Sequence, residues 1–178
     1  MHPWSMQAEG EVVGLADAPA AAPASFDAFF EEGHDRLFRA LYFVTGSRQD
    51  AEELMQDAYL KLWERWGDRK IQDPTAYLFR VALNGFRMRR RRAAMAIRKV
   101  VPVSEARDPF VDAEIRADVR RLLLEITPRQ RAAVLLVDLL GYPSEEAAQI
   151  LGVRPSTVRA LATKGRQVLR SSEGGRDA

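Results

Sequence analysis

A cluster of hydroxyl-bearing and basic side chains lies near the C-terminal end of this 178-residue chain. It follows Pro155, on what would be the outward face of one helix, and consists of Ser156, Thr157, Arg159, Thr163, Lys164 and Arg166. Hydroxyl and guanidinium groups are the groups with which proteins reach base edges and phosphates in DNA. This face therefore predicts a DNA-reading helix, with the solvated basic face of an ordinary helical hairpin as the alternative.

A second basic cluster lies in the middle of the chain, where no acidic residue occurs between Pro74 and Lys99. The cations in this stretch are Arg80, Arg87, Arg89, Arg90, Arg91, Arg92, Arg98 and Lys99. Like charges at this density repel one another unless a polyanion compensates them, which favours a nucleic acid backbone as the partner. Tyr77, Phe79 and Phe86 accompany them and are rings of the type that stack on unpaired bases, with core packing as the other interpretation.

A third candidate surface is the polar face of an amphipathic segment over residues 51–66. Apolar side chains recur there at helical spacing, which predicts an inward side made of Ala51, Leu54, Met55, Ala58, Tyr59, Leu62, Trp63 and Trp66. The other face carries Glu52, Glu53, Gln56, Asp57, Lys61 and Glu64. Charge alone favours a solvated acidic face, and a docking surface is the alternative.

The elements that position the C-terminal cluster read as a helix-turn-helix preceded by a third helix. Thr127 and Gln130 can form a capping box, and Gly141 suits the end of that lead-in helix. Ser144 is expected to cap the next helix, and Gly152 permits the positive φ of a sharp turn. The core of the helix pair is predicted at Ala147, Leu151, Val153, Val158 and Leu161, and the close crossing at Ala148.

The whole chain predicts an all-α fold, with two small helical domains joined by a flexible linker and a helix-turn-helix in the C-terminal domain. In the first domain a helix is expected over residues 26–44, its apolar stripe broken by Gly33, and further helices start after Ser47 and Asp73. The predicted divisions are a disordered tail over 1–24, a domain over 25–99, a linker over 100–111, a domain over 112–170 beginning with a helix at Asp112, and a tail over 171–178.

Composition excludes several classes of function. The chain has no cysteine, which excludes disulfides and thiolate metal sites, and only two histidines. No phosphate-cradling glycine loop occurs, so nothing predicts catalysis, a cofactor or a metal site. No apolar run approaches the length of a membrane span, and the N-terminus does not resemble a signal peptide. The expectation is a cytoplasmic protein without membrane insertion.

Three motifs, in this order and with these gaps, resemble the extracytoplasmic-function (ECF) group of bacterial RNA polymerase sigma factors. They are residues 50–63 (DAEELMQDAYLKLW), residues 74–84 (PTAYLFRVALN) and residues 127–170, which begin TPRQR. The resemblance extends from Phe26 to Arg170. It implies a promoter-specificity subunit that binds core RNA polymerase through the β′ clamp helices and the β flap, binds promoter DNA, and has an anti-sigma factor as a further partner.

The resemblance also implies residue roles. Polymerase docking is expected at Glu53, Gln56, Asp57, Leu60 and Lys61. Recognition and melting of the −10 element are expected at Ile71, Gln72, Asp73, Tyr77, Arg80, Asn84, Arg87, Arg90 and Arg91, where the loop 71–73 holds a flipped base and binding energy drives melting. The −35 element is expected to meet Arg154, Ser156, Thr157, Arg159, Thr163, Lys164 and Arg166 in the major groove.

Some positions depart from the family pattern. Leu161 stands where the family usually has an arginine, which removes one phosphate contact, and Gly165 is expected to weaken the recognition helix by about 1 kcal/mol relative to alanine.

The alternatives to a sigma factor are a stand-alone helix-turn-helix regulator that binds palindromic operators without polymerase, and a helical adaptor whose basic helix holds RNA or an acidic protein.

Overall fold

The computed structural model describes residues 25–96 and 121–174. The predicted N-terminal tail, the linker over 100–111, the helix expected from Asp112 and the last residues of the C-terminal tail lie outside these ranges. Within them the chain is helical and contains no strand, as the sequence predicts.

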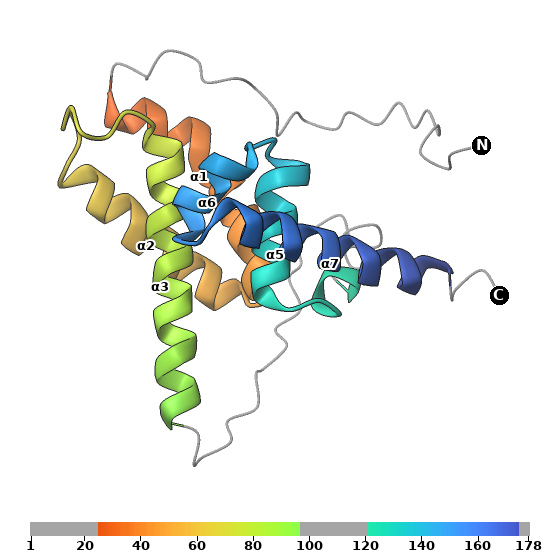
Figure 1. Cartoon of the computed structure of the whole chain (residues 1–178). Coiled ribbons are helices and arrows are strands. Elements are labelled where there is room, and N and C mark those ends of the chain that lie inside the picture. The colour runs from red at the N-terminus through yellow and green to blue at the C-terminus, as the bar shows by residue number, and fades with distance from the viewer. Residues whose placement is uncertain (1–24, 97–120, 175–178) are drawn as a thin grey trace, which may run out of the picture.

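The first unit consists of α1 (Phe26–Thr45), α2 (Arg48–Trp63) and α3 (Pro74–Ala96). Local chemistry determines the helix starts, because the Ser47 side chain accepts a hydrogen bond from the Asp50 amide and Asp73 accepts one from the Ala76 amide. Both predicted starts are therefore confirmed. α3 is the longest of these helices, and its C-terminal half projects beyond the rest of the molecule (Figure 1).

α1 is continuous from Phe26 to Thr45, as predicted, and Gly33 interrupts only its apolar stripe. A β-carbon at Gly33 would lie 3.0 Å from the hydroxyl oxygen of Tyr59 on α2. The glycine therefore permits close contact between the two helices, and its place in the apolar stripe reflects packing. Tyr59 is buried among Phe26, Phe29 and Phe30, whose rings lie within 6.2 Å of its own.

The second unit consists of α5 (Pro128–Val134), the π-helix η1 (Leu135–Leu139), α6 (Ser144–Leu151) and α7 (Pro155–Gly174), and residues 121–124 before it are also helical. The capping box is confirmed, since Thr127 accepts from the Gln130 amide and Gln130 accepts from the Thr127 amide. The expected turn conformation is also confirmed, with φ of 71° at Gly141 and 63° at Gly152.

Two details of the second unit differ from expectation. Ser144 is the first residue of α6 and makes no capping bond, because Pro143 occupies the N-cap position and its carbonyl accepts the first helical hydrogen bond, from the Ala147 amide. The apolar run after Val134 becomes a π-turn, in which the Leu140 amide bonds the Leu135 carbonyl over 2.9 Å. A π-turn shifts the register of the side chains that follow it.

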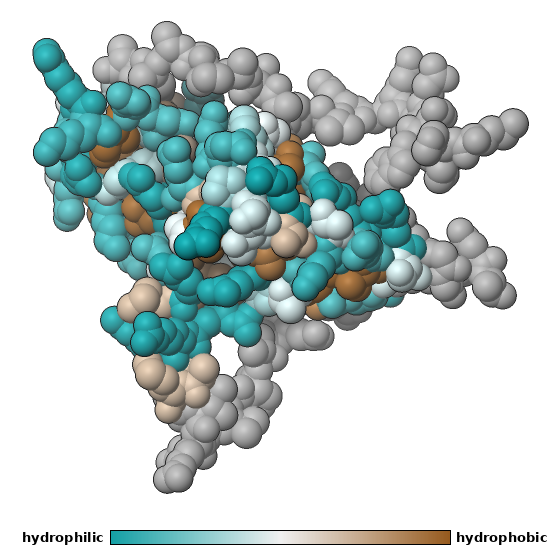
Figure 2. All heavy atoms as spheres, in the orientation of Figure 1, coloured by the Kyte–Doolittle hydropathy of each residue, from teal (hydrophilic) through white to brown (hydrophobic). Residues whose placement is uncertain are grey.

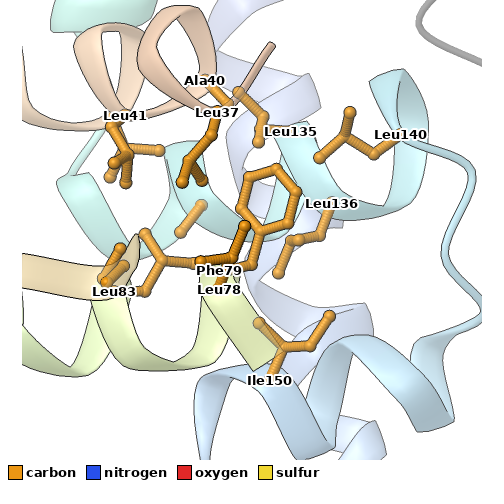
Figure 3. Packing of buried hydrophobic residues seen from close by; sticks show 14 of the residues in the cluster. Leu37, Ala40, Leu41, Leu78, Phe79, Leu83, Leu135, Leu136, Leu140 and Ile150 are labelled. Atoms are coloured by element: carbon orange, nitrogen blue, oxygen red, sulfur yellow. The ribbon is translucent and has the colours of Figure 1, made fainter. Parts of the chain in front are cut away.

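The two units share one hydrophobic core. In Figure 3, Leu37, Leu78, Phe79 and Leu83 of the first unit lie in the same cluster as Leu135, Leu136, Leu140 and Ile150 of the second. The ring of Tyr142, just after the π-turn, meets the ring of Phe79 edge-on with centroids 6.4 Å apart. The second unit, which contains the helix-turn-helix, is thus packed directly on α1 and α3.

Candidate nucleic-acid and polymerase interfaces

The predicted docking residues form one exposed face of α2. Glu53, Gln56, Asp57, Leu60 and Lys61 are all exposed. The apolar Leu60 is 60% exposed and gives the face a hydrophobic centre.

Trp63 belongs to this face, although the sequence pattern placed it in the core. Its side chain is 62% exposed, whereas Trp66 is half-buried against the ring of Phe26, 5.3 Å away. A usable signal was the seven-residue separation from Gln56, which is about two helical turns and puts both residues on one side of α2. Trp63 is therefore a correction to the predicted core and an addition to the candidate docking face.

Arg89 of α3 also faces α2. Its guanidinium lies 2.6 Å from a Glu53 carboxylate oxygen, 3.1 Å from one of Asp57 and 3.9 Å from one of Asp50. Hydrogen bonds from Gln49 and from Arg89 lower the pKa of Glu53 below its ordinary value. Arg89, although part of the arginine-rich segment, thus binds the acidic face of α2 and points away from the positions expected to meet DNA.

The other cations of α3 remain on its surface. Arg80, Asn84, Arg87, Arg90 and Arg91 are all exposed. The Arg87 guanidinium donates to the Asn84 side-chain oxygen over 2.7 Å. Figure 2 shows teal, hydrophilic side chains along the projecting half of α3, interspersed with pale brown apolar ones towards its tip. These side chains form a basic column of the kind that follows a phosphate backbone.

The three aromatic rings of α3 are less exposed than stacking on unpaired bases would require. Tyr77 is only 8% exposed and Phe79 1%, and Phe86 is half-buried. The guanidinium groups of Arg65 and Arg80 lie over the Tyr77 ring, 5.6 Å and 5.4 Å from its centroid. In this arrangement the Tyr77 face is covered, so it does not offer a stacking surface to a base.

A small pocket lies where α2 leads into α3. Its volume is about 280 Å³, and its lining residues are Leu62, Trp66, Gly67, Asp68, Arg69, Ile71 and Pro74. The loop is held by Asp68, which accepts hydrogen bonds from the Lys70 amide and from Arg65. These two bonds lower the pKa of the Asp68 carboxyl. Ile71 is half-buried, while Gln72 and Asp73 next to the pocket are exposed.

The predicted recognition helix is α7, and its inward side is closed by Val158 and Ala162, which are buried. The exposed residues of the predicted set are Arg154, Ser156, Thr157, Arg159, Thr163 and Lys164. Arg166 is half-buried and donates to Asp138 over 2.8 Å, and Arg159 donates to Glu145 over 3.2 Å. Arg166 is thus the member of the set most engaged within the protein.

A groove separates α3 from the helix-turn-helix. It has a volume of about 430 Å³. Asn84, Arg87 and Arg90 line it from α3, and Thr157 and Leu161 line it from α7. Side chains expected to meet the −10 element therefore lie close to one expected to meet the −35 element.

In the described ranges, no helix has both the length and the apolar run that a bilayer crossing requires. The same ranges contain no group of three or more His, Asp or Glu side chains placed to hold a metal ion.

Two family models match the chain in sequential order. The model of sigma-70 region 2 matches residues 29–95, and the model of sigma-70 region 4 matches residues 116–169. The first match spans the docking face and the basic column, and the second contains the helix-turn-helix.

Curated relatives of the chain include ECF RNA polymerase sigma factors. The chain is 31% identical to the ECF RNA polymerase sigma factor SigE of Mycolicibacterium smegmatis over 90% of its own length and 66% of that protein's. It is 30% identical to the ECF RNA polymerase sigma factor SigM of Mycobacterium tuberculosis over 85% of its own length and 79% of that protein's.

Solved structures share the fold. The sigma factor RpoE of Bartonella quintana, in complex with the anti-sigma factor NepR, has a TM-score of 0.68 at 20% identity, covering 82% of this chain and 94% of that one. The ECF sigma factor SigJ of Mycobacterium tuberculosis has a TM-score of 0.55 at 30% identity, covering 81% of this chain and 53% of that one. With both regions matched in order, the chain belongs to the extracytoplasmic-function family of RNA polymerase sigma factors, non-catalytic subunits that direct promoter-specific transcription initiation.

Proposed function

We propose that the exposed face of α2 is the surface through which this sigma factor docks on the β′ clamp helices of core RNA polymerase. The observation that supports this most directly is the pair Leu60 and Trp63, two large apolar side chains that remain in water beside Glu53 and Asp57. Tryptophan is among the residues enriched at protein–protein hot spots, and an apolar centre with a polar rim is the usual layout of an interface.

Recognition of the −10 element is assigned to α3 and the loop before it. The basic column of Arg80, Arg87, Arg90 and Arg91 supports a grip on the DNA backbone, and Asn84 lies on the same exposed side. The pocket beside Ile71 has apolar walls of Leu62 and Trp66, which suit the face of a flipped base. Trapping flipped bases would keep the strands apart by binding energy, without nucleotide hydrolysis.

Recognition of the −35 element is assigned to α7. Its first turns present Ser156, Thr157 and Arg159 to solvent, and the N-terminal part of a recognition helix is the part that reaches base edges. Thr163 and Lys164 lie further along and are suited to sugar–phosphate contacts. The β flap of the polymerase is proposed as the partner that holds this unit over the DNA.

An anti-sigma factor is proposed as a further partner, because the sigma factors RpoE and CnrH, which share this fold, were solved in complex with NepR and with the cytosolic domain of CnrY. By the same family argument the protein is proposed to be no enzyme by itself and to act in the cytoplasm, where its polymerase acts. The stand-alone regulator is not favoured, because region 2 accompanies the helix-turn-helix.

The deciding experiment is binding to core polymerase lacking its own sigma factor, followed by run-off transcription on genomic fragments. The full chain should bind and produce discrete transcripts. Asp57→Arg and Trp63→Ala should each weaken binding at least about tenfold, as expected for hot-spot residues. Glu32→Arg, an equivalent charge reversal at an exposed position of α1, should bind like the parent. Absence of binding by the parent protein would refute the proposal.

A further inference from the structure

The groove between α3 and the second unit has the composition of a small-molecule site. Its volume of about 430 Å³ lies within the range of about 300–1,000 Å³ that such sites occupy, and it is too small for a duplex. Small-molecule sites are mostly apolar and contain a few charged or polar groups that fix the orientation of the ligand. Both kinds of group line this groove.

Apolar side chains from three helices form its walls. Leu83 and Phe86 come from α3, Ile150 and Leu151 from α6, and Leu161 from α7. Leu83 and Ile150 are buried in the shared core of Figure 3, whereas Phe86, Leu151 and Leu161 are half-buried. An apolar molecule bound against these half-buried side chains would leave water together with them, which favours binding.

The charged part of the lining is cationic. Arg87 and Arg90 of α3 and Arg129 of α5 line the groove, and no acidic side chain of the described residues does so. Within the same residues, none of the three guanidinium groups forms an ion pair with a carboxylate. Three cations without a counter-charge favour an anionic ligand over a neutral one.

Two of these cations are oriented by neutral neighbours. The Arg87 guanidinium donates to the Asn84 side-chain oxygen over 2.7 Å, and a β-carbon built on Gly152 would lie 3.8 Å from it. The Arg90 guanidinium lies over the Phe86 ring, 5.9 Å from its centroid. Side chains that are oriented before a ligand arrives lose less entropy when it binds.

Positive charge is also present behind the α5 wall. Arg131 is 6% exposed and is the chain neighbour of Ala132, which lines the groove. Burial lowers the pKa of Arg131 to about 10, and the positive charge of Arg90 adds to the effect. An anion bound beside Arg90 would offset the repulsion between the two arginines, so this second layer of charge favours the same kind of ligand.

We propose that the groove is a binding site for a small amphipathic acid, with an apolar body against Phe86, Leu151 and Leu161 and a carboxylate held by Arg87 and Arg90. Guanidinium groups suit a carboxylate because they can donate two parallel hydrogen bonds to it. A medium-chain fatty acid is the simplest molecule of this class. The site lies beyond the promoter and polymerase contacts of the proposed function and does not depend on them.

The test is calorimetric titration of the full-length protein with decanoate, below the concentration at which decanoate forms micelles. Decanoate should form a saturable one-to-one complex. Hexanoate should bind at least about tenfold more weakly, because its shorter chain removes less apolar surface from water. The neutral 1-decanol keeps the chain and lacks the charge, and it should bind at least about threefold more weakly.

The lining arginines provide the variants. Arg87→Gln and Arg90→Gln should each weaken decanoate binding about three- to fivefold, the effect of one partly exposed ion pair, and the double variant should weaken it at least about tenfold. Arg92→Gln is the matched control, because Arg92 is exposed on the same helix and does not line the groove. It should bind decanoate like the parent.

Leu161→Asn tests the apolar wall and should weaken decanoate binding at least about fivefold, because it removes an aliphatic contact. Circular dichroism checks that this variant is folded, and the surface arginine variants decide the question if it is not. In a second measurement, saturating decanoate should raise the thermal unfolding midpoint of the parent, because a ligand of the folded state stabilises it. The double arginine variant should show no such rise.

Four results would overturn the proposal. Decanoate could bind in several copies or lower the unfolding midpoint, which is the behaviour of a detergent. Hexanoate could bind as tightly as decanoate, or inorganic phosphate could displace decanoate at equal concentration, which would leave only a patch of charge. Arg87→Gln and Arg90→Gln could bind like Arg92→Gln, or no saturable binding could occur at all. Polymerase and DNA are absent from these titrations, so none of these results bears on the proposed function.

Discussion

The guanidinium of Arg89 on α3 and the carboxylate of Glu53 on α2 form an ion pair across 2.6 Å. This contact joins the helix proposed to read the −10 element to the helix proposed to dock on polymerase. Asp57 lies 3.1 Å from the same guanidinium, so one arginine organises two carboxylates of the docking face.

Arg89→Ala should weaken polymerase binding by about two- to fivefold, because exposed ion pairs contribute at most about 1 kcal/mol. The physical reason is that Glu53 and Asp57 lose the group that holds their carboxylates in place. Titration of core polymerase with labelled protein measures the change, and raising the salt concentration should reduce the difference. Arg91→Ala is the control, since Arg91 is exposed two residues away and is assigned to DNA. An equal loss in both variants would show that general charge matters and the specific pair does not.

The carboxyl of Glu53 should titrate below the ordinary glutamate range in the folded protein, because Gln49 and Arg89 both donate to its charged form. A depressed pKa in the folded state contributes stability above the unfolded pKa of about 4.3, and this contribution is lost as the pH falls through the lower folded value. Carboxyl-detected NMR titration measures it. In Arg89→Ala the pKa should rise towards the ordinary value, and an unchanged pKa would refute the assigned cause.

Gly165→Ala should destabilise the protein by about 1–3 kcal/mol, the range for overpacking a well-filled core. The added β-carbon would lie 2.8 Å from Val134 of α5, so at this site the packing cost is expected to exceed the helix propensity that alanine gains. Thermal unfolding followed by circular dichroism measures the effect. Ala160→Gly, at an exposed position of α7, provides the comparison and should cost about 1 kcal/mol from helix propensity alone. A stabilised Gly165→Ala protein would contradict the packing role.

Lys164→Gln should weaken promoter binding of the holoenzyme about equally on different −35 sequences, and the salt dependence should fall by about one unit of slope. Lys164 is exposed on α7 beyond the turns proposed to read bases, which suits a phosphate contact. Thr157→Ala should instead change the preference among −35 sequences. Binding to a small library of −35 variants distinguishes the two effects, and a sequence-dependent loss in Lys164→Gln would contradict its assignment.

The amino-acid sequence was enough to predict the helical fold, the helix starts at Ser47, Asp73 and Thr127, and the turn at Gly152. These features depend on interactions within three or four residues along the chain, which is why a linear pattern contains them. The order of the three family motifs was likewise visible without coordinates.

The exposure of Trp63, the burial of Tyr77 and the close approach of α7 to Val134 at Gly165 became clear from the packing of the helices. The packing also shows that Arg89 faces α2 and that the two units share one core. Each of these depends on which surfaces meet across segments far apart in the sequence. Helical periodicity identifies an apolar face, but the partner helix determines how much of that face is covered.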